Sequence, residues 1–126
     1  MKKIAIRVEK TETGYSAYAE NYPVYTIGNN LDELKTNILE GLNLYFEEVE
    51  DNITEPDLKI TLDLPQFFDF YKVINAKALS ERIGMNQSLL AQYIKGNKKP
   101  SSAQTQRILK GVQQIGRELS EIGFLL

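Results

Sequence analysis

The chain has 126 residues, of which 42% are apolar and 25% are charged, and its net charge is −2. This length allows one domain or two small ones, the composition is that of a globular protein that can bury a core, and no apolar run is long enough to cross a bilayer. Cysteine and histidine are both absent, which excludes disulfides and thiolate metal sites and removes the commonest general base.

The first residues lack the apolar segment of a signal peptide because charged side chains interrupt them. We therefore expect a cytoplasmic protein. The charge is divided unevenly along the chain. Residues 1–74 carry 7 Lys and Arg against 14 Asp and Glu, a net −7, whereas residues 75–126 carry 8 against 3, a net +5. This division predicts that the second half suits nucleic acid and that the first half suits a basic partner.

The N-terminal half begins with a run in which apolar and polar side chains alternate. Ile4, Ile6 and Val8 share one face of residues 3–8, which predicts a strand with one buried face. Residues 15–20 and 24–27 are expected to be two further strands, because turn residues separate the three runs. Short connections of this kind predict an antiparallel meander.

A helix is expected next, with Asn30 as its cap and Glu33 at the capping-box position. Its apolar residues recur every three or four positions, and it fades at residues 50–52. A fourth strand over residues 57–64 then returns the chain to the sheet. Residues 1–64 are thus expected to form an α+β domain of order βββαβ. The predicted apolar stripe of the helix is Leu31, Leu34, Ile38, Leu42, Tyr45 and Val49.

The second predicted domain, residues 65–126, is all-α. Pro65 fits the first turn of a helix over residues 66–74, which we expect to pack on the helices that follow it.

Two short helices joined by a tight turn are expected next. Asn75 and Asn86 are suited to cap their N-termini, and Gly84 and Gly96 are suited to end them.

The outward face of the second short helix is polar and contains no carboxylate. Hydrogen-bonding side chains in its first turn are what a helix needs to read base edges in the major groove, and the lysines after it are placed for phosphate contacts. The alternative interpretation is a small helical hairpin with a solvated polar face. The predicted base-reading residues are Gln87, Ser88 and Gln92, and the predicted phosphate-contacting residues are Asn86, Lys95, Asn97, Lys98 and Lys99.

These residues carry a resemblance. The segments LSERIGMNQS and GNKKPS resemble the opening and the close of an Xre/Cro-type repressor helix–turn–helix. The resemblance implies a DNA-binding module. Ala76 stands where that family often has Gln.

A long helix is expected from Ser101 or Ser102 to about residue 122. Its apolar stripe is longer than one small helical domain covers, and residues 124–126 extend it, so we expect a homodimer or a higher even-numbered oligomer. The alternative is that the tail folds back on its own domain. Gly111 and Gly116 weaken the helix and suggest close helix contact. The predicted dimerisation residues are Ile108, Val112, Ile115, Leu119 and Ile122.

An enzyme is not expected. The carboxylates are spread like solvated charge and show no tight metal-binding pattern, and there is no Gly-rich phosphate loop. We accordingly expect no catalytic residue, no metal and no cofactor. Four tyrosines gather in the meander, where they fit either edge packing or an aromatic contact surface.

A second resemblance covers residues 1–64. Gly14-Tyr15, Tyr22-Pro23, Thr26-Ile27-Gly28, Asp32-Glu33 and Tyr45-Phe46 are similar to the pattern of the HicB antitoxin N-terminal domain. The resemblance implies a truncated ribonuclease H-like fold without its catalytic carboxylates. It also implies that the domain binds and silences a small basic ribonuclease, a HicA-like toxin that uses a His. The residues expected to bind the toxin are Tyr15, Tyr18, Glu20, Tyr22 and Tyr25.

HicB antitoxins carry either a ribbon–helix–helix or an Xre-type module, so the two resemblances are compatible. Together they imply an antitoxin of a type II toxin–antitoxin pair that represses its own operon by binding operator DNA. The alternative is a free-standing helix–turn–helix regulator whose α+β domain senses a small ligand.

Overall fold

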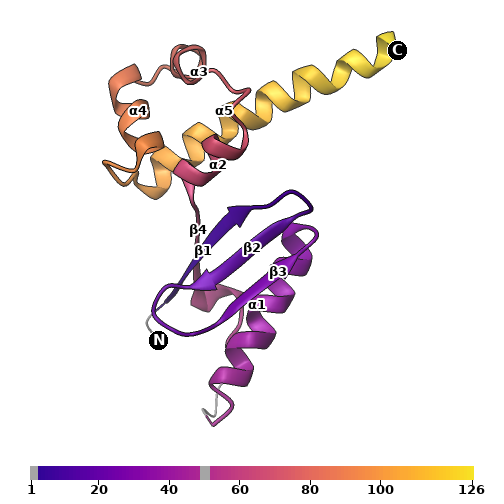
Figure 1. The fold of residues 1–126 in the computed structure, drawn as a ribbon, viewed down its shortest axis with the longest axis vertical. Coiled ribbons are helices and arrows are strands. Elements are labelled where there is room, and N and C mark those ends of the chain that lie inside the picture. The colour runs from indigo at the N-terminus through magenta and orange to yellow at the C-terminus, as the bar shows by residue number, and fades with distance from the viewer. Residues whose placement is uncertain (1–2, 49–51) are drawn as a thin grey trace. The chain divides into compact units, whose positions relative to one another are not determined.

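The computed structural model describes residues 3–48 and 52–126, and the chain divides into two compact units (Figure 1). Unit 1 is Met1–Phe70 and unit 2 is Tyr71–Leu126. The predicted helix residues Val49, Glu50 and Asp51 lie outside the described part. The elements are β1 (Ile4–Lys10), β2 (Tyr15–Ala19), β3 (Tyr25–Gly28), α1 (Leu31–Tyr45), the 3-10 turn η1 (Glu55–Asp57), β4 (Leu58–Leu62), α2 (Leu64–Phe70), α3 (Ala76–Ile83), α4 (Gln87–Lys95), α5 (Ser102–Ser120) and the 3-10 turn η2 (Glu121–Leu125).

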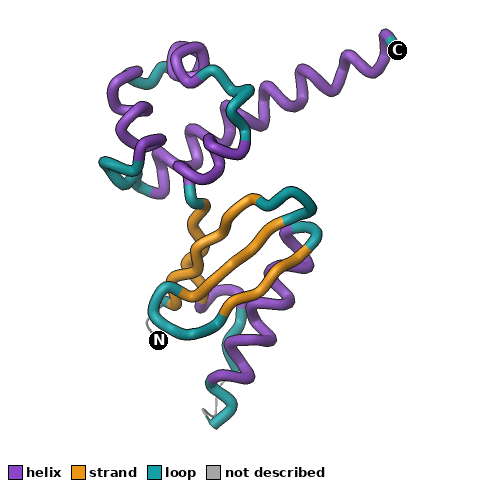
Figure 2. The backbone as a smooth tube through the Cα atoms, in the orientation of Figure 1, coloured by secondary structure: helices purple, strands orange, loops and turns teal. Residues whose placement is uncertain are grey.

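Unit 1 is built on a four-stranded mixed sheet of order β3-β2-β1-β4 (Figure 2). The first three strands form the predicted antiparallel meander. β4 returns to the sheet and pairs parallel with β1, with Ile6 opposite Ile60. The predicted order βββαβ is confirmed, and the N-terminal half is α+β, with helices after it.

Helix α1 covers one face of this sheet. The alternation predicted for β1 is confirmed, because Ile4, Ile6 and Val8 are buried in one core with the apolar side chains of α1. Within α1, Leu34, Ile38 and Leu42 are buried. The predicted stripe is wrong at its ends, since Leu31 and Tyr45 are exposed. The core cluster consists of Ile4, Ile6, Val8, Ala17, Ala19, Val24, Leu34, Ile38, Leu42, Ile53 and Leu58.

Both ends of α1 are fixed by side-chain hydrogen bonds. The Asn30 Oδ1 accepts from the Glu33 N–H at 2.8 Å, which confirms the predicted cap. Asn43 binds the segment before η1: its Oδ1 accepts from the Ile53 N–H at 2.7 Å and its Nδ2 donates to the Ile53 carbonyl at 3.0 Å. These paired bonds anchor Ile53, which is buried in the core.

Helix α2 lies in unit 1, whereas the expected boundary was after residue 64. The Gln66 side chain accepts from the Lys10 N–H at 2.8 Å and donates to the Lys10 carbonyl at 2.6 Å. Asp63 caps α2 through the Gln66 N–H and also accepts from Arg7 Nε at 3.1 Å. These bonds hold α2 against β1.

Unit 2 consists of α3, α4 and α5. Its buried apolar side chains are Leu79, Met85, Leu90, Tyr93 and Ile108. Asn75 and Ser101 cap α3 and α5 through bonds of 3.0 and 3.1 Å, respectively. Gly84 and Gly96 end α3 and α4 at φ values of 67° and 80°, a left-handed conformation that costs glycine nothing.

Candidate nucleic-acid interface

Helix α4 exposes a polar face and buries an apolar one. Leu90 and Tyr93 are buried, whereas Gln87, Ser88 and Gln92 are exposed. Gln87 and Ser88 lie in the first helical turn, and Gln92 lies four residues after Ser88, on the same side of the helix. The structure therefore brings the three predicted base-reading residues together on one exposed surface.

The lysines follow this face at the C-terminal end of α4. Lys95 is the last residue of the helix, and Asn97, Lys98 and Lys99 are exposed in the turn that Gly96 begins. The turn is held because the N–H groups of Asn97 and Lys98 both donate to the Gln92 carbonyl, at 2.9 and 3.3 Å. The backbone is thus fixed while the lysine side chains face solvent.

Asn86, a predicted phosphate-contacting residue, caps the N-terminus of α4, and this cap limits how its side chain can contact a phosphate. Its Oδ1 accepts from the N–H groups of Ser88 and Leu89, at 2.8 and 3.2 Å. This cap satisfies two donors that the helix start leaves unpaired. The side-chain oxygen is therefore committed to the cap, and Nδ2 is the group that remains as a donor.

Arg107 is a residue of α5 that sequence reasoning missed. Its guanidinium donates to the Ile83 carbonyl at 2.9 and 3.2 Å and to the Gly84 carbonyl at 2.7 Å. Carbonyls at the end of α3 lack helical partners, and a cationic side chain satisfies them well. Arg107 thus fixes the turn from which α4 starts. The sequence shows an arginine at this position, but no pattern in it indicates which groups the side chain binds.

Positive charge dominates this unit. Residues 82–117 contain seven Lys and Arg and no Asp or Glu. Glu118 is paired, because its Oε1 accepts from Arg82 Nη2 at 2.7 Å. The hydrogen bond from Arg82, together with a second from Gln114, lowers the pKa of Glu118 below its ordinary value. A surface that combines such positive charge with neutral hydrogen-bonding side chains attracts polyanions.

The expected contact tyrosines of unit 1 do not form one group. Tyr18 and Tyr25 are paired across β2 and β3 on the face of the sheet opposite α1. Tyr15 lies on the α1 face, with Lys10 Nζ at 5.0 Å from its ring centroid. Glu20 is exposed, and its Oε1 lies 3.6 Å from Arg7 Nη1.

Tyr22 joins a different aromatic cluster, at the C-terminal end of α1. Its ring centroid lies 4.9 Å from that of Phe46 and 5.8 Å from that of Tyr45. The exposed carboxylates Glu47 and Glu48 follow directly. Aromatic rings beside carboxylates suit a basic protein surface.

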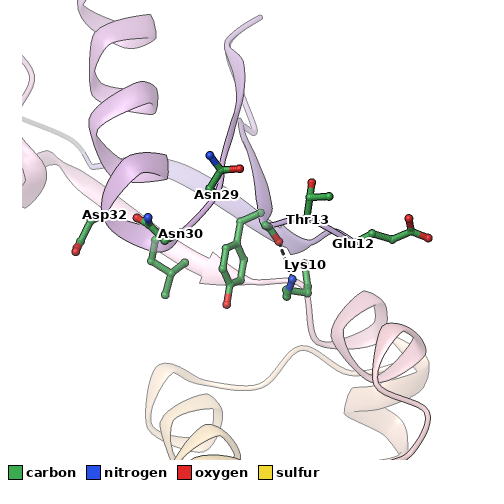
Figure 3. A pocket seen from close by; sticks show the side chains of 9 residues that line it. Lys10, Glu12, Thr13, Asn29, Asn30 and Asp32 are labelled. Atoms are coloured by element: carbon green, nitrogen blue, oxygen red, sulfur yellow. Dashed lines mark hydrogen bonds between the residues drawn. The ribbon is translucent and has the colours of Figure 1, made fainter.

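A hollow of about 520 Å³ lies between the β1–β2 turn and the start of α1 (Figure 3). Two of its polar groups are already engaged. Lys10 Nζ donates to the carbonyls of Thr11 and Gly14, at 2.6 and 3.0 Å, and Asn30 Oδ1 caps α1. Glu12, Asn29 and Asp32 line the same hollow.

Residues 3–48 and 52–126 contain no group of three or more Asp and Glu side chains placed to hold a metal ion. Within the same residues, no helix combines the length and the apolar character needed to span a bilayer.

The predicted dimerisation residues fall into two groups along α5. Ile108 is fully buried, so it lies in the interior of unit 2 and is not available to a second copy. Val112 and Ile115 are half-buried. Leu119 and Ile122 are exposed, as is the tail, where Phe124 is 94% exposed. The tail does not fold back, and the end of α5 extends away from α3 and α4 (Figure 1).

Comparison with family models, with curated proteins and with solved structures found no match.

Proposed function

We propose that this protein is an antitoxin of a type II toxin–antitoxin pair, in which unit 2 binds the operator of its own operon and unit 1 binds and neutralises a small basic ribonuclease. The observation that carries the DNA-binding half is the exposed face of α4. Gln87, Ser88 and Gln92 lie together there, the lysines follow at the Gly96 turn, and both helix ends are fixed by caps.

This face fits the Xre/Cro-type module that the sequence resembles. Glutamine can bond adenine through two groups at once, worth about 1–3 kcal/mol against a wrong base. The lysines supply phosphate contacts, each of which releases condensed counterion. Two copies of unit 2, joined through the exposed part of α5, would read two half-sites about one turn of DNA apart.

Support for the antitoxin half comes from charge, from fold order and from the HicB resemblance. Unit 1 carries 6 Lys and Arg against 14 Asp and Glu, a net −8, which favours a basic partner and repels nucleic acid. The order βββαβ is compatible with the truncated ribonuclease H-like fold that the HicB resemblance implies, and the lack of catalytic carboxylates in that fold is part of the same proposal.

DNA binding is tested by measuring the affinity of the full chain for DNA from upstream of its reading frame at several salt concentrations. We expect the variant with Lys95→Ala, Lys98→Ala and Lys99→Ala to bind all DNA more weakly and with a flatter salt dependence. A variant with Lys3→Ala, Lys35→Ala and Lys59→Ala loses the same charge from unit 1 and is the control. Equal salt slopes for the two variants would show that the lysines after α4 contact no phosphate.

Toxin neutralisation is tested by co-expressing the chain with the small basic protein encoded in the neighbouring reading frame. We expect the two proteins to copurify and the chain to restore growth that the basic protein arrests. Growth arrest that the chain does not relieve would refute the antitoxin assignment.

The hollow of unit 1 favours a second candidate, a free-standing regulator whose α+β domain senses a small ligand. Its volume fits a small molecule. Saturable release of DNA by a metabolite, without any protein partner, would support this candidate over the antitoxin.

A further inference from the structure

The sheet of unit 1 ends in an edge strand, β3, whose hydrogen-bonding groups can be assigned from the ladder. The Glu20 N–H donates to the Ala5 carbonyl at 3.0 Å, and the Ala19 N–H donates to the Val24 carbonyl at 2.9 Å. Because inward and outward groups alternate along a strand, Val24, Thr26 and Gly28 bond to β2. The N–H and carbonyl groups of Tyr25 and Ile27 therefore point away from the sheet.

These outward groups are largely open. The Ile27 carbonyl accepts from Asn37 Nδ2 at 2.8 Å. Among the described residues, the Tyr25 N–H, the Tyr25 carbonyl and the Ile27 N–H have no hydrogen-bond partner. An edge of this kind is a template for one more strand. The side chains beside it are apolar and open as well, since Tyr25 is 66% exposed and Ile27 is 62% exposed.

The other side of this edge is acidic. The hydrogen bond from Asn37 to β3 shows which side of α1 faces the edge. Glu33 and Glu40 lie four residues before and three residues after Asn37, so they share that side of the helix, and both are exposed. A strand added at β3 would have apolar neighbours on one face and carboxylates on the other.

We infer that the β3 edge takes an extended segment of a basic partner protein in which apolar and Lys or Arg residues alternate. Side chains opposite Tyr25 and Ile27 would fall on the apolar face, and those between them would fall on the face of Glu33 and Glu40, because successive side chains of a strand alternate. A second copy of this chain is disfavoured, since pairing β3 with itself would bring two sets of these carboxylates together. The identity of the occupant rests on the proposed antitoxin function.

The test uses the full chain, labelled with ¹⁵N, and the capped peptide Val-Lys-Val-Lys-Val-Lys-Val. We expect the peptide to slow hydrogen exchange of the Tyr25 and Ile27 amides. Its counterpart with Glu in place of Lys should bind at least about tenfold more weakly. N-methylation of the third residue, a valine, removes one backbone donor from the peptide and should weaken binding by about tenfold.

The chain offers a matched pair of variants. Ile27→Pro removes an outward N–H from the β3 edge and leaves the bonds to β2 intact. Ile60→Pro makes the same change at the other edge of the sheet. The Asp63 N–H donates to the Val8 carbonyl of β1, and because inward and outward groups alternate along a strand, the N–H of Ile60 points away from β1. The Ile60 side chain is 41% exposed. We expect Ile27→Pro to weaken peptide binding by about tenfold and Ile60→Pro to leave it unchanged.

Charge is tested by a second pair. Glu33→Gln with Glu40→Gln should weaken binding of the lysine peptide, whereas Glu81→Gln with Glu121→Gln, which removes the same charge from exposed residues of unit 2, should not. The inference is overturned if the Tyr25 and Ile27 amides are not protected at millimolar peptide, if both proline variants behave alike, or if the two amides are protected by self-association without peptide.

Copurification with the basic protein of the neighbouring reading frame separates this inference from the proposed function. If the unaltered chain retains that protein and Ile27→Pro loses it while Ile60→Pro does not, the edge assignment is supported. If both variants retain it equally, the edge assignment fails and the antitoxin proposal stands. If the unaltered chain does not bind it but binds the lysine peptide at β3, the antitoxin proposal and the partner's identity fail, and the strand-accepting edge stands.

Discussion

Two glycines of α5, Gly111 and Gly116, allow a test of helix packing, because alanine at these two positions should affect the stability of unit 2 differently. A Cβ added at Gly111 would lie 2.4 Å from Ile83 Cγ2 and 3.3 Å from Leu79 Cδ1, whereas a Cβ added at Gly116 would meet nothing within 4 Å. Carbon atoms in contact prefer about 3.5–4.0 Å. Gly111 therefore marks the point where α5 approaches α3, as predicted, and Gly116 does not.

The expected magnitudes follow from these distances. Replacing either glycine by alanine gains about 1 kcal/mol of helix propensity. At Gly111, forcing a methyl group into the contact with Ile83 costs about 1–3 kcal/mol. We therefore expect Gly116→Ala to stabilise unit 2 by about 1 kcal/mol. The free energy of unfolding of Gly111→Ala should be about 1–3 kcal/mol lower than that of Gly116→Ala.

Urea unfolding of the full chain, followed by circular dichroism, measures this difference, and hydrogen exchange of the α5 amides assigns the transition to unit 2. Ile83→Ala removes the clashing atom, so the penalty of Gly111→Ala should disappear in that background. Equal stabilisation by Gly111→Ala and Gly116→Ala would refute the close packing of α5 on α3.

Three further predictions concern α5. Arg107→Ala should destabilise the turn after Ile83 by about 1.5–3 kcal/mol, seen as faster exchange of α4 amides with α1 amides unchanged; unchanged α4 exchange would contradict the role of the guanidinium. Because Arg82 lowers the pKa of Glu118, the pair stabilises unit 2 above the ordinary carboxyl pKa of 4.5, and this stabilisation is lost as the pH falls through the lowered pKa. Glu118→Gln should therefore be less stable than the parent at pH 7 and equally stable in acid, which urea unfolding at each pH measures. A loss of stability that persists in acid would count against the pair. Leu119→Glu should give a folded monomer with weaker operator binding by ultracentrifugation and anisotropy, and sedimentation as the parent oligomer would place any dimer interface elsewhere.

Features set by local chemistry were predicted well from the sequence. The caps at Asn30, Asn75 and Asn86 depend on a side chain and a backbone group only two or three residues away, and left-handed Gly84 and Gly96 depend on the absence of a Cβ. The polar face of α4 follows from helical periodicity alone.

Features set by distant residues were not predicted. Helix α2 was expected in the second domain because the bond between Gln66 and Lys10 joins residues far apart in the sequence, and no local pattern indicates it. Periodicity identifies the apolar side of a helix but not how much of that side other residues cover, so Leu31 was expected to be buried. The β3 edge could not be assigned because the direction of its backbone groups depends on the register with β2.

Binding of the chain to upstream DNA tests the central claim most directly. Fluorescence anisotropy would compare this DNA with a scrambled duplex of equal length at one fixed salt concentration, for the unaltered chain and for Gln87→Ala. We expect the unaltered chain to prefer the upstream DNA and Gln87→Ala to lose that preference, by a factor corresponding to about 1–3 kcal/mol, while its affinity for the scrambled duplex stays the same. An unaltered chain that binds both duplexes equally, or neither, would contradict the account.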